Sequence, residues 1–172
     1  SAPAMYNDEL IIESMMNVGY SLEDARDYVA IGCVEPTAPG KTLGSTDAGM
    51  YNMALALEMA LNQGRQFGSS RQIGALTKPV SDMTSMQDVL DAYDTQTKHQ
   101  LAKLHADLQA VERFHAEYHP TPLTSATLDG CLEAGKCSTQ GSAKYTFSGI
   151  QGTGLAVVAD SLGAIESAVF ED

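Results

Sequence analysis

The 172-residue sequence contains no tryptophan, only three cysteines, and fewer than half as many basic residues as acidic ones. Ten lysines and arginines face 22 aspartates and glutamates, and the net charge of −12 argues against nucleic acid and anionic membrane surfaces as partners. No apolar run approaches the length of a membrane span. Because no secretory leader follows Ser1, we interpret Cys33, Cys131 and Cys137 as free thiols in a reducing compartment, the cytoplasm.

The rest of the composition is that of a folded domain. Apolar residues make up 44% of the chain and charged residues 19%, which is typical of globular rather than disordered proteins. A chain of this length is close to the usual size of one domain. Strands that feed helices along the sequence predict an α/β fold with parallel strands, in which helix dominates by length.

Local signals predict the first helices and one long helix. Asn7 or Asp8 caps a helix that Gly19 ends, and the capping-box pattern "SLED" at Ser21 opens a second, short helix. Apolar residues at helical spacing predict a long amphipathic helix over residues 85 to about 118.

The C-terminal part is predicted to contain a helix over residues 124–135, a short strand, a glycine-rich turn and a final amphipathic helix. The turn at residues 149–154 is a weak match to a phosphate-binding loop, in which glycines between a strand and a helix hold a pyrophosphate. Gly152 and Gly154 have the spacing G-x-G, but the third glycine position falls on Val157. Close packing of backbone against backbone explains these glycines better, and a nucleotide-binding module is an alternative.

The stretch "VAIGCVEPTAPGKTLGSTDAG", residues 29–49, is predicted to join a buried strand at residues 28–32 to a helix that begins near residue 48. The glycines and prolines between residues 35 and 46 predict an irregular loop. Asp47 stands at the expected start of the helix, where an aspartate most often serves as N-cap.

Cys33 and Glu35 are the candidate catalytic pair, because loops beyond strand ends collect ligands and catalytic groups in α/β folds. Residues two apart in an extended segment point to the same side, so both side chains are predicted to face one pocket. A carboxylate beside a thiol disfavours the thiolate of a cysteine protease. The pair suits a thiol that exchanges a hydrogen atom while the carboxylate moves a proton.

No metal site is predicted. A Cys-x-Glu pair without a nearby histidine lacks zinc-ligand spacing. His115 and His119 have the i, i+4 spacing of a metal pair, but no third ligand is evident beside them, and we interpret them as part of a solvated helix face.

Two parts of the sequence resemble the glycyl radical enzymes. Residues 3–64, above all "GCVEP" at residues 32–36, are similar to the cysteine-loop region of that family, and residues 125–162 are similar to the stretch that follows. The resemblance is strongest to the branch with glycerol and propanediol dehydratases, choline trimethylamine-lyase and hydroxyproline dehydratase. It implies a helix-rich part of a ten-stranded α/β barrel with the cysteine loop threaded into its centre.

The resemblance also implies roles for four residues. Cys33 would be the thiyl radical that abstracts hydrogen from the substrate, and Glu35 the general base that acts on its hydroxyl group. Asp47 would hold the polar groups of the substrate, and Met50 would line its pocket. The reaction implied is the dehydration of a small hydroxylated substrate.

Residues 1–172 are expected to be an internal fragment of a single catalytic barrel domain, its cysteine-loop half, because the glycine-loop motif "RVAGY" does not occur. The resemblance implies a glycyl radical on a residue absent from this chain, installed by a radical-SAM activating enzyme, and no cofactor bound directly. It further implies a homodimer at full length, in an anaerobic cytoplasm or a bacterial microcompartment. The isolated fragment is expected to be inactive.

The sequence departs from the family pattern near the substrate pocket. Thr46 and Ser45 stand where relatives place a histidine and a tryptophan, and Val34 replaces a second cysteine, which argues against pyruvate formate-lyase chemistry. Besides dehydration, three other family reactions are open: C–N cleavage, C–S cleavage and decarboxylation. Outside the family, the nucleotide-binding module at residues 149–154 and a purely structural segment are the alternatives.

Overall fold

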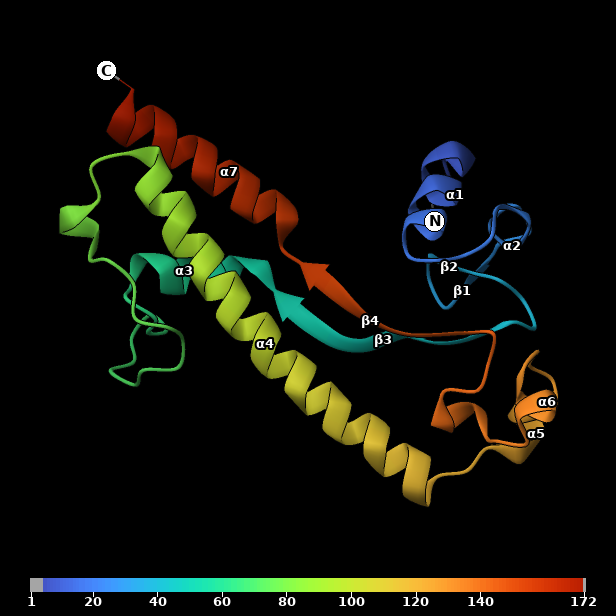
Figure 1. Cartoon of the computed structure of the whole chain (residues 1–172). Helices are drawn as coiled ribbons and strands as arrows, with labels where there is room; N and C mark the ends of the chain where they lie inside the picture. Colours follow the sequence, from blue (N-terminus) through green and yellow to red (C-terminus); the bar gives the residue numbers. More distant parts are fainter. Residues whose placement is uncertain (1–4, 172) are drawn as a thin grey trace. The chain divides into compact units, whose positions relative to one another are not determined.

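The computed structural model describes residues 5–171, which form two compact units: residues up to 46 with 110–149, and residues 47–109 with those from 150 onward (Figure 1). The main helices are α1 (Asp8–Asn17), α2 (Leu22–Arg26), α3 (Met53–Leu61), α4 (Met86–Tyr118), α5 (Pro122–Ser125), α6 (Cys131–Ala134) and α7 (Leu155–Ile165). The strands are β1 (Val29–Ile31), β2 (Glu35–Thr37), β3 (Thr42–Asn52) and β4 (Tyr145–Thr153). The short helices are η1 (Val80–Asp82), η2 (Ser138–Gln140) and the π-helical turn η3 (Glu166–Phe170).

The first unit is organised around the two helices at the start of the chain. Asn7 accepts a hydrogen bond from the Leu10 N–H at 3.3 Å, and Ser21 accepts one from the Asp24 N–H at 3.1 Å, so both predicted N-caps are confirmed. A core then forms where α1 and α2 meet the segment after β2; its buried members are Met15, Tyr20, Ala25 and Ala38. The Tyr20 ring lies 4.3 Å from the Tyr145 ring, between centroids, which adds β4 to this core.

The second unit is held together by α3, α4 and α7. Leu57, Val89 and Val158, one from each helix, form its buried apolar cluster. Gln96 of α4 is completely buried, accepts from the Ala75 N–H at 3.0 Å and donates to the Ala75 carbonyl at 2.6 Å. The Gln96 side chain thus satisfies both backbone groups of Ala75 and holds the segment before α4 against that helix.

Strands β3 and β4 pair with each other, and both arrows in Figure 1 point the same way. In the first unit, the Tyr145 N–H donates to the Lys41 carbonyl at 2.9 Å. In the second unit, the Thr153 hydroxyl donates to the Tyr51 carbonyl at 3.4 Å. Residue numbers therefore rise together along both strands, so β3 and β4 are parallel, as the predicted α/β class requires. The strand predicted at residues 28–32 does not join this pair. It is β1, which pairs antiparallel with β2 and is exposed at Val29 and Ala30, so the prediction of a buried parallel strand there was wrong.

The prediction for residues 35–64 was partly wrong. Residues 35–46 were expected to be irregular, yet they contain β2 and the beginning of β3. The helix expected to begin near residue 48 begins at Met53. Asn52 is its N-cap, because its side chain accepts from the Leu55 N–H at 3.0 Å. Pairing with β4, about a hundred residues later, turns residues 48–52 into strand despite their helical spacing of apolar residues.

The helix predicted over residues 124–135 is two short helices, α5 and α6, with a break between them. Gly130 has a positive φ of 94°, and a Cβ there would lie 2.6 Å from the Ser142 carbonyl oxygen. A regular helix cannot pass through such a residue.

None of the helices described within residues 5–171 combines the length and the apolar character of a membrane-spanning segment.

Candidate functional site

Cys33 lies at the tip of a β-hairpin. Strands β1 and β2 pair antiparallel, with Ile31 opposite Glu35, so residues 32–34 form the turn between them. The segment was predicted to be extended from Cys33 to Glu35; the turn shows that prediction to be wrong, because the chain reverses between the two strands. Cys33 is exposed at the tip, and Glu35 is half-buried where β2 begins.

The carboxylate of Glu35 folds back over the turn. Its Oε2 atom accepts hydrogen bonds from the Cys33 N–H at 2.8 Å and from the Val34 N–H at 2.9 Å. Two successive N–H groups that point to one side form a concavity for a negative charge, and here the carboxylate fills it. The thiol and the carboxylate are therefore joined through the backbone of a three-residue turn, which keeps both at one end of the hairpin.

Gly32 is required in this turn for two reasons. Its φ of 57° lies in the left-handed region, which side chains disfavour. A Cβ at this position would also lie 2.8 Å from Glu35 Oε2, closer than carbon and oxygen approach without a bond. The glycine in "GCVEP" thus makes room for the carboxylate that holds the cysteine loop.

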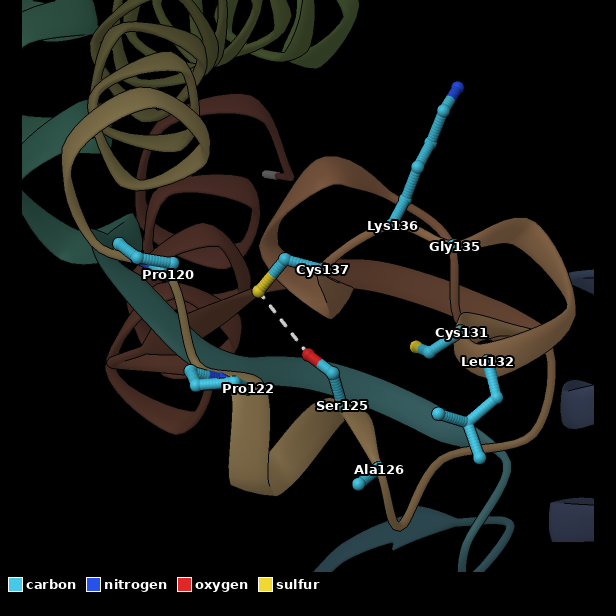
Figure 2. A pocket seen from close by; sticks show the side chains of 9 residues that line it. All are labelled: Pro120, Pro122, Ser125, Ala126, Cys131, Leu132, Gly135, Lys136 and Cys137. Carbon is cyan, nitrogen blue, oxygen red and sulfur yellow. Dashed lines mark hydrogen bonds between the residues drawn. The ribbon is translucent and has the colours of Figure 1, made fainter.

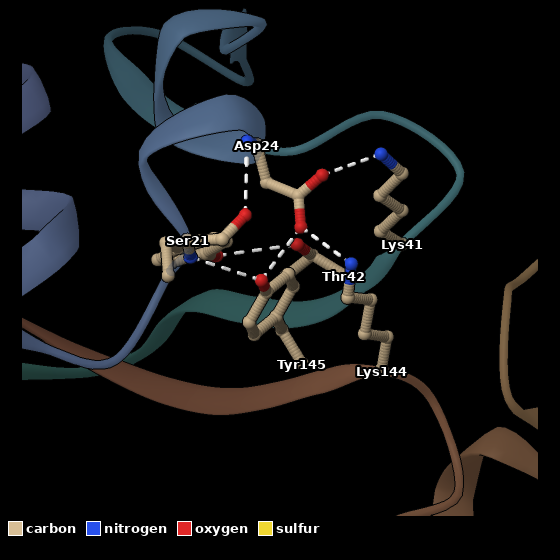
Figure 3. Close-up of polar contacts among 7 residues, drawn as sticks. Ser21, Asp24, Lys41, Thr42, Lys144 and Tyr145 are labelled. Carbon is tan, nitrogen blue, oxygen red and sulfur yellow. Dashed lines mark hydrogen bonds and ion pairs between the residues drawn. The ribbon is translucent and has the colours of Figure 1, made fainter.

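The hairpin is anchored at its base by a buried carboxylate, Asp24, which lies in α2 (Figure 3). Asp24 is 2% exposed and forms an ion pair with Lys41, a second with Lys144 at 2.7 Å, and a hydrogen bond from the Tyr145 hydroxyl at 2.6 Å. Since Asp24 precedes the hairpin and Lys41 follows it, their ion pair closes the segment that carries Cys33 and Glu35.

Electrostatics at this anchor favour the ionised carboxylate. Lys144 first, then Lys41 and the Tyr145 hydroxyl, hold the pKa of Asp24 well below its usual range, although burial acts in the opposite direction. Asp24 in turn raises the pKa of both lysines. Every charge that this unit buries at the anchor is paired, which is the condition under which buried charge is stable.

Asp47 and Met50 lie in the second unit, both on β3. Asp47 was interpreted from its position in the sequence as an N-cap, and this was wrong, because the strand continues for five more residues before α3. Asp47 is exposed, and Met50 is 61% exposed. A Cβ at Gly49 would meet Leu104 of α4, so the alternation of a strand directs Met50, the next residue, away from that helix.

The glycine-rich segment at residues 149–154 is mostly strand rather than turn. Gly149 and Gly152 lie within β4, and only Gly154, with a φ of 86°, turns the chain into α7. A Cβ at Gly149 would lie 2.7 Å from the Thr46 carbonyl oxygen. Close backbone packing of β4 on β3 therefore accounts for Gly149. The prediction named Gly152 and Gly154, and there a Cβ would first meet side-chain atoms, of Met53 and Ala54 respectively.

His115 lies in the last turn of α4, whereas His119, also expected on the helix, directly follows its end at Tyr118. His115 and His119 stack with their ring centroids 5.7 Å apart. Within residues 5–171, no group of three or more His, Cys, Asp or Glu side chains is placed to hold a metal ion.

Sequence reasoning missed one polar cluster, around Cys137. Its sulfur accepts hydrogen bonds from the Thr121 N–H and the Thr139 hydroxyl, and the Ser125 hydroxyl lies 3.2 Å away. The only local signal is the run of small hydroxylated residues next to the cysteine in "KCSTQGS".

The family model for pyruvate formate lyase-like proteins matches residues 1–172, the whole chain. The chain belongs to the pyruvate formate lyase-like family. The resemblance to glycyl radical enzymes, inferred above from the cysteine loop, is confirmed.

Relatives of this pyruvate formate lyase-like chain include dehydratases. It is 36% identical over 170 residues to the (2S)-3-sulfopropanediol dehydratase of Klebsiella oxytoca, and the alignment covers 99% of this chain and 21% of that enzyme. The B12-independent glycerol dehydratase of Clostridium butyricum matches with a TM-score of 0.94 and 40% identity, over 99% of this chain and 22% of that one. A glycyl radical enzyme of Archaeoglobus fulgidus matches with a TM-score of 0.88 and 36% identity, over 94% of this chain and 21% of that one.

These matches confirm the predicted fold class, a helix-rich α/β part of the glycyl radical enzyme fold. The chain spans about a fifth of the length of the relatives it matches. The pyruvate formate lyase-like segment described here is the one that carries the "GCVEP" hairpin.

Proposed function

We propose that this chain is the cysteine-loop part of a glycyl radical dehydratase, which eliminates water from a small hydroxylated substrate. The observation that carries the proposal is the hairpin, in which the Glu35 carboxylate binds the two N–H groups of the turn that presents Cys33. The relatives named above as dehydratases contain a segment of the same fold.

The radical itself would reside on a glycine outside residues 1–172, and a radical-SAM enzyme would install it. When present, it supplies the oxidising equivalent that converts a cysteine thiol into a thiyl radical. Cys33 fits that exchange, because its thiol is exposed at the end of a hairpin and no donor among residues 5–171 binds its sulfur. A sulfur of this kind is available to hydrogen-atom transfer.

The residues of the hairpin then divide the chemistry between them. Cys33, as thiyl, takes the hydrogen atom from the carbon that bears a hydroxyl group, and Glu35 accepts the proton of that hydroxyl. The electron-rich carbon–oxygen radical expels the neighbouring hydroxide, which takes the proton from Glu35 and leaves as water. The product radical recovers the hydrogen atom from the Cys33 thiol, so both residues return to their starting states.

Asp47 and Met50 are proposed to hold and to line the substrate, respectively. Both are exposed on β3, and an exposed carboxylate can accept hydrogen bonds from the hydroxyl groups of a small polyol. The smaller Ser45 and Thr46 beside them leave more room than the tryptophan and histidine of relatives, which favours a substrate of different shape.

The whole protein is further proposed to consist of one catalytic barrel domain around this segment and to work as a homodimer in an anaerobic cytoplasm or a bacterial microcompartment.

The test is a substrate assay of the whole protein that contains this segment, activated without oxygen. Glycerol, 1,2-propanediol, sulfopropanediol and hydroxyproline are offered, and loss of water to an aldehyde, ketone or imine product is measured. The proposal predicts C–O cleavage of at least one compound. Cleavage of only C–N or C–S bonds, in a wider panel, would contradict it.

A further inference from the structure

A cavity of about 230 Å³ lies in the first unit, lined by the short helices α5 and α6 and the segments that flank them (Figure 2). Its wall is mainly apolar and includes Pro120, Pro122, Ala126, Leu132 and two cysteines, Cys131 and Cys137. Lys136 also belongs to the wall, but its ammonium group points away from the cavity in Figure 2. This cavity has no part in the function proposed above.

The sulfur of Cys137 is surrounded by hydrogen-bond donors. The Thr121 N–H lies 3.0 Å from Sγ, the Thr139 hydroxyl 3.3 Å and the Ser125 hydroxyl 3.2 Å. The Thr121 hydroxyl is a further neighbour at 3.5 Å. A sulfur that receives several donors is stabilised as the thiolate, because each donor interacts more strongly with the charged form.

The Ser125 hydroxyl has other acceptors besides the sulfur. The Ser125 hydroxyl also lies 2.7 Å from the Thr121 carbonyl oxygen, and its single proton serves one acceptor at a time. The Thr121 N–H has no such choice and donates to the sulfur. Together, the hydroxyl of Ser125, those of Thr121 and Thr139, and the Thr121 N–H lower the pKa of Cys137 to about 5.

The other cysteine of the cavity differs in burial and in partners. Cys131 is 2% exposed, and the Ser142 hydroxyl 3.2 Å from its sulfur also lies 2.9 Å from the Lys136 and Cys137 carbonyl oxygens. Cys137 is half-buried, so a reagent in the cavity can reach its sulfur. The two residues therefore give a matched pair: a half-buried sulfur that receives the Thr121 N–H and the Thr139 hydroxyl, and a buried sulfur beside one shared hydroxyl.

We propose that Cys137 is a nucleophilic modification site, and that the cavity admits a small, uncharged, largely apolar disulfide for exchange with its sulfur. The Cys137 thiolate attacks one sulfur of the disulfide R–S–S–R, a bond forms between them, the old S–S bond breaks and RS⁻ leaves. No other oxidant is needed. A cavity of about 150 Å³ accommodates benzene, so this one has room for one aromatic or short aliphatic R group.

The charge of the protein selects among such disulfides. The net charge of −12 of this chain disfavours anionic reagents, and the ammonium group of Lys136, the charged residue of the wall, points away from the cavity. Uncharged disulfides are therefore expected to react faster than anionic ones of the same intrinsic reactivity.

The experiment uses the whole protein in its native state, treated with 4,4′-dithiodipyridine, a small neutral aromatic disulfide. Released thiopyridone gives the rate, and peptide mapping by mass spectrometry assigns it to each cysteine. Between about pH 6 and about pH 8 the rate at Cys137 is expected to change less than twofold, whereas that of a free thiol, N-acetylcysteine, rises roughly 75-fold.

Two variants serve as controls. Cys137→Ser is expected to abolish the fast phase, and Cys131→Ala to leave it within about twofold of the wild-type rate. Wild-type labelling needs no variant, so the result does not depend on how the variants fold. If Cys137 stays unlabelled in the native whole protein, or if its rate follows the pH dependence of the free thiol, the proposal is overturned.

Discussion

Cys33 and Cys137 lie in turns of the same unit, and the two turns use their donors in opposite ways. In the hairpin, the N–H groups of Cys33 and Val34 point at the Glu35 carboxylate, and within residues 5–171 no donor binds the Cys33 sulfur. In the second turn, an N–H group and neighbouring hydroxyls point at the Cys137 sulfur itself.

The difference shows that the direction of nearby donors decides what a cysteine can do. Donors aimed at sulfur stabilise charge there, which suits nucleophilic exchange. Donors aimed at an adjacent carboxylate hold a base in place and leave the sulfur for hydrogen-atom transfer. The turn at Cys33 thus suits radical chemistry of sulfur, and the turn at Cys137, about a hundred residues later in the chain, suits ionic chemistry.

The largest expected effect comes from Glu35→Gln in the whole protein. The amide oxygen can still accept from the two N–H groups of the turn, but the amide cannot take up the substrate proton. Turnover should therefore fall by roughly 10²- to 10⁴-fold while the thermal midpoint stays close to wild type. Glu35→Ala, the matched control, should lose turnover and also lower the thermal midpoint. If the Glu35→Gln variant kept wild-type turnover, Glu35 would not be the general base.

Asp24→Asn should cause the next largest effect, on stability and its pH dependence. The folded-state pKa of Asp24 is lowered, so its ion pairs stabilise the protein above the unfolded value near 4 and lose that contribution as the pH falls below it. Wild type should be clearly more stable at neutral pH, and the gap should close in acid. Thermal unfolding of both proteins from neutral pH into acid measures this. A gap independent of pH would show that the carboxylate charge is not what anchors the hairpin.

The substitutions Gly32→Ala, beside Cys33, and Gly135→Ala, beside the Cys137 cavity, compare the two cysteine turns directly, and the second is the control for the first. Both glycines have nearly the same φ, 57° and 60°, but only the Cβ at residue 32 meets an atom, Glu35 Oε2. Each substitution should cost about 1–2 kcal/mol for its backbone conformation. Only Gly32→Ala should cost more than that in urea unfolding, and only it should reduce turnover. Equal losses in both variants would mean that the carboxylate contact is unimportant.

Thr139→Val should have the smallest effect. It removes one hydroxyl donor from Cys137 and leaves the Thr121 N–H in place. The pH midpoint of the disulfide-exchange rate should rise by less than about one unit, because the remaining donors persist. Turnover of the whole protein should not change. A large rise would identify Thr139, rather than the backbone, as the main support of the thiolate.

Local signals in the sequence were sufficient for much of the fold. The caps Asn7 and Ser21 and the long helix α4 depend on neighbouring residues, and the structure confirms them. The strand β3 depends on pairing with β4, far away in the sequence, and was predicted as loop and helix. Asp47 was misplaced for the same reason.

The candidate site shows the same limit. The short spacing of Cys33 and Glu35 is enough to place them in one loop. The reversal at residues 32–34 was not predicted, because the apolar run before it places Gly32 in the strand. The Cys137 cluster was missed altogether. Its principal donor, on Thr121, lies 16 residues earlier and reaches the sulfur only through the arrangement of α5 and η2.

The most direct test is a comparison of turnover with the glycyl radical signal in electron paramagnetic resonance, for the activated whole protein with Cys33→Ala. Cys137→Ala serves as the matched control. We expect the Cys33 variant to keep the radical signal at the wild-type level and to form no product, while the Cys137 variant keeps both. Product formation by the Cys33 variant would contradict the assignment of hydrogen-atom transfer to this sulfur.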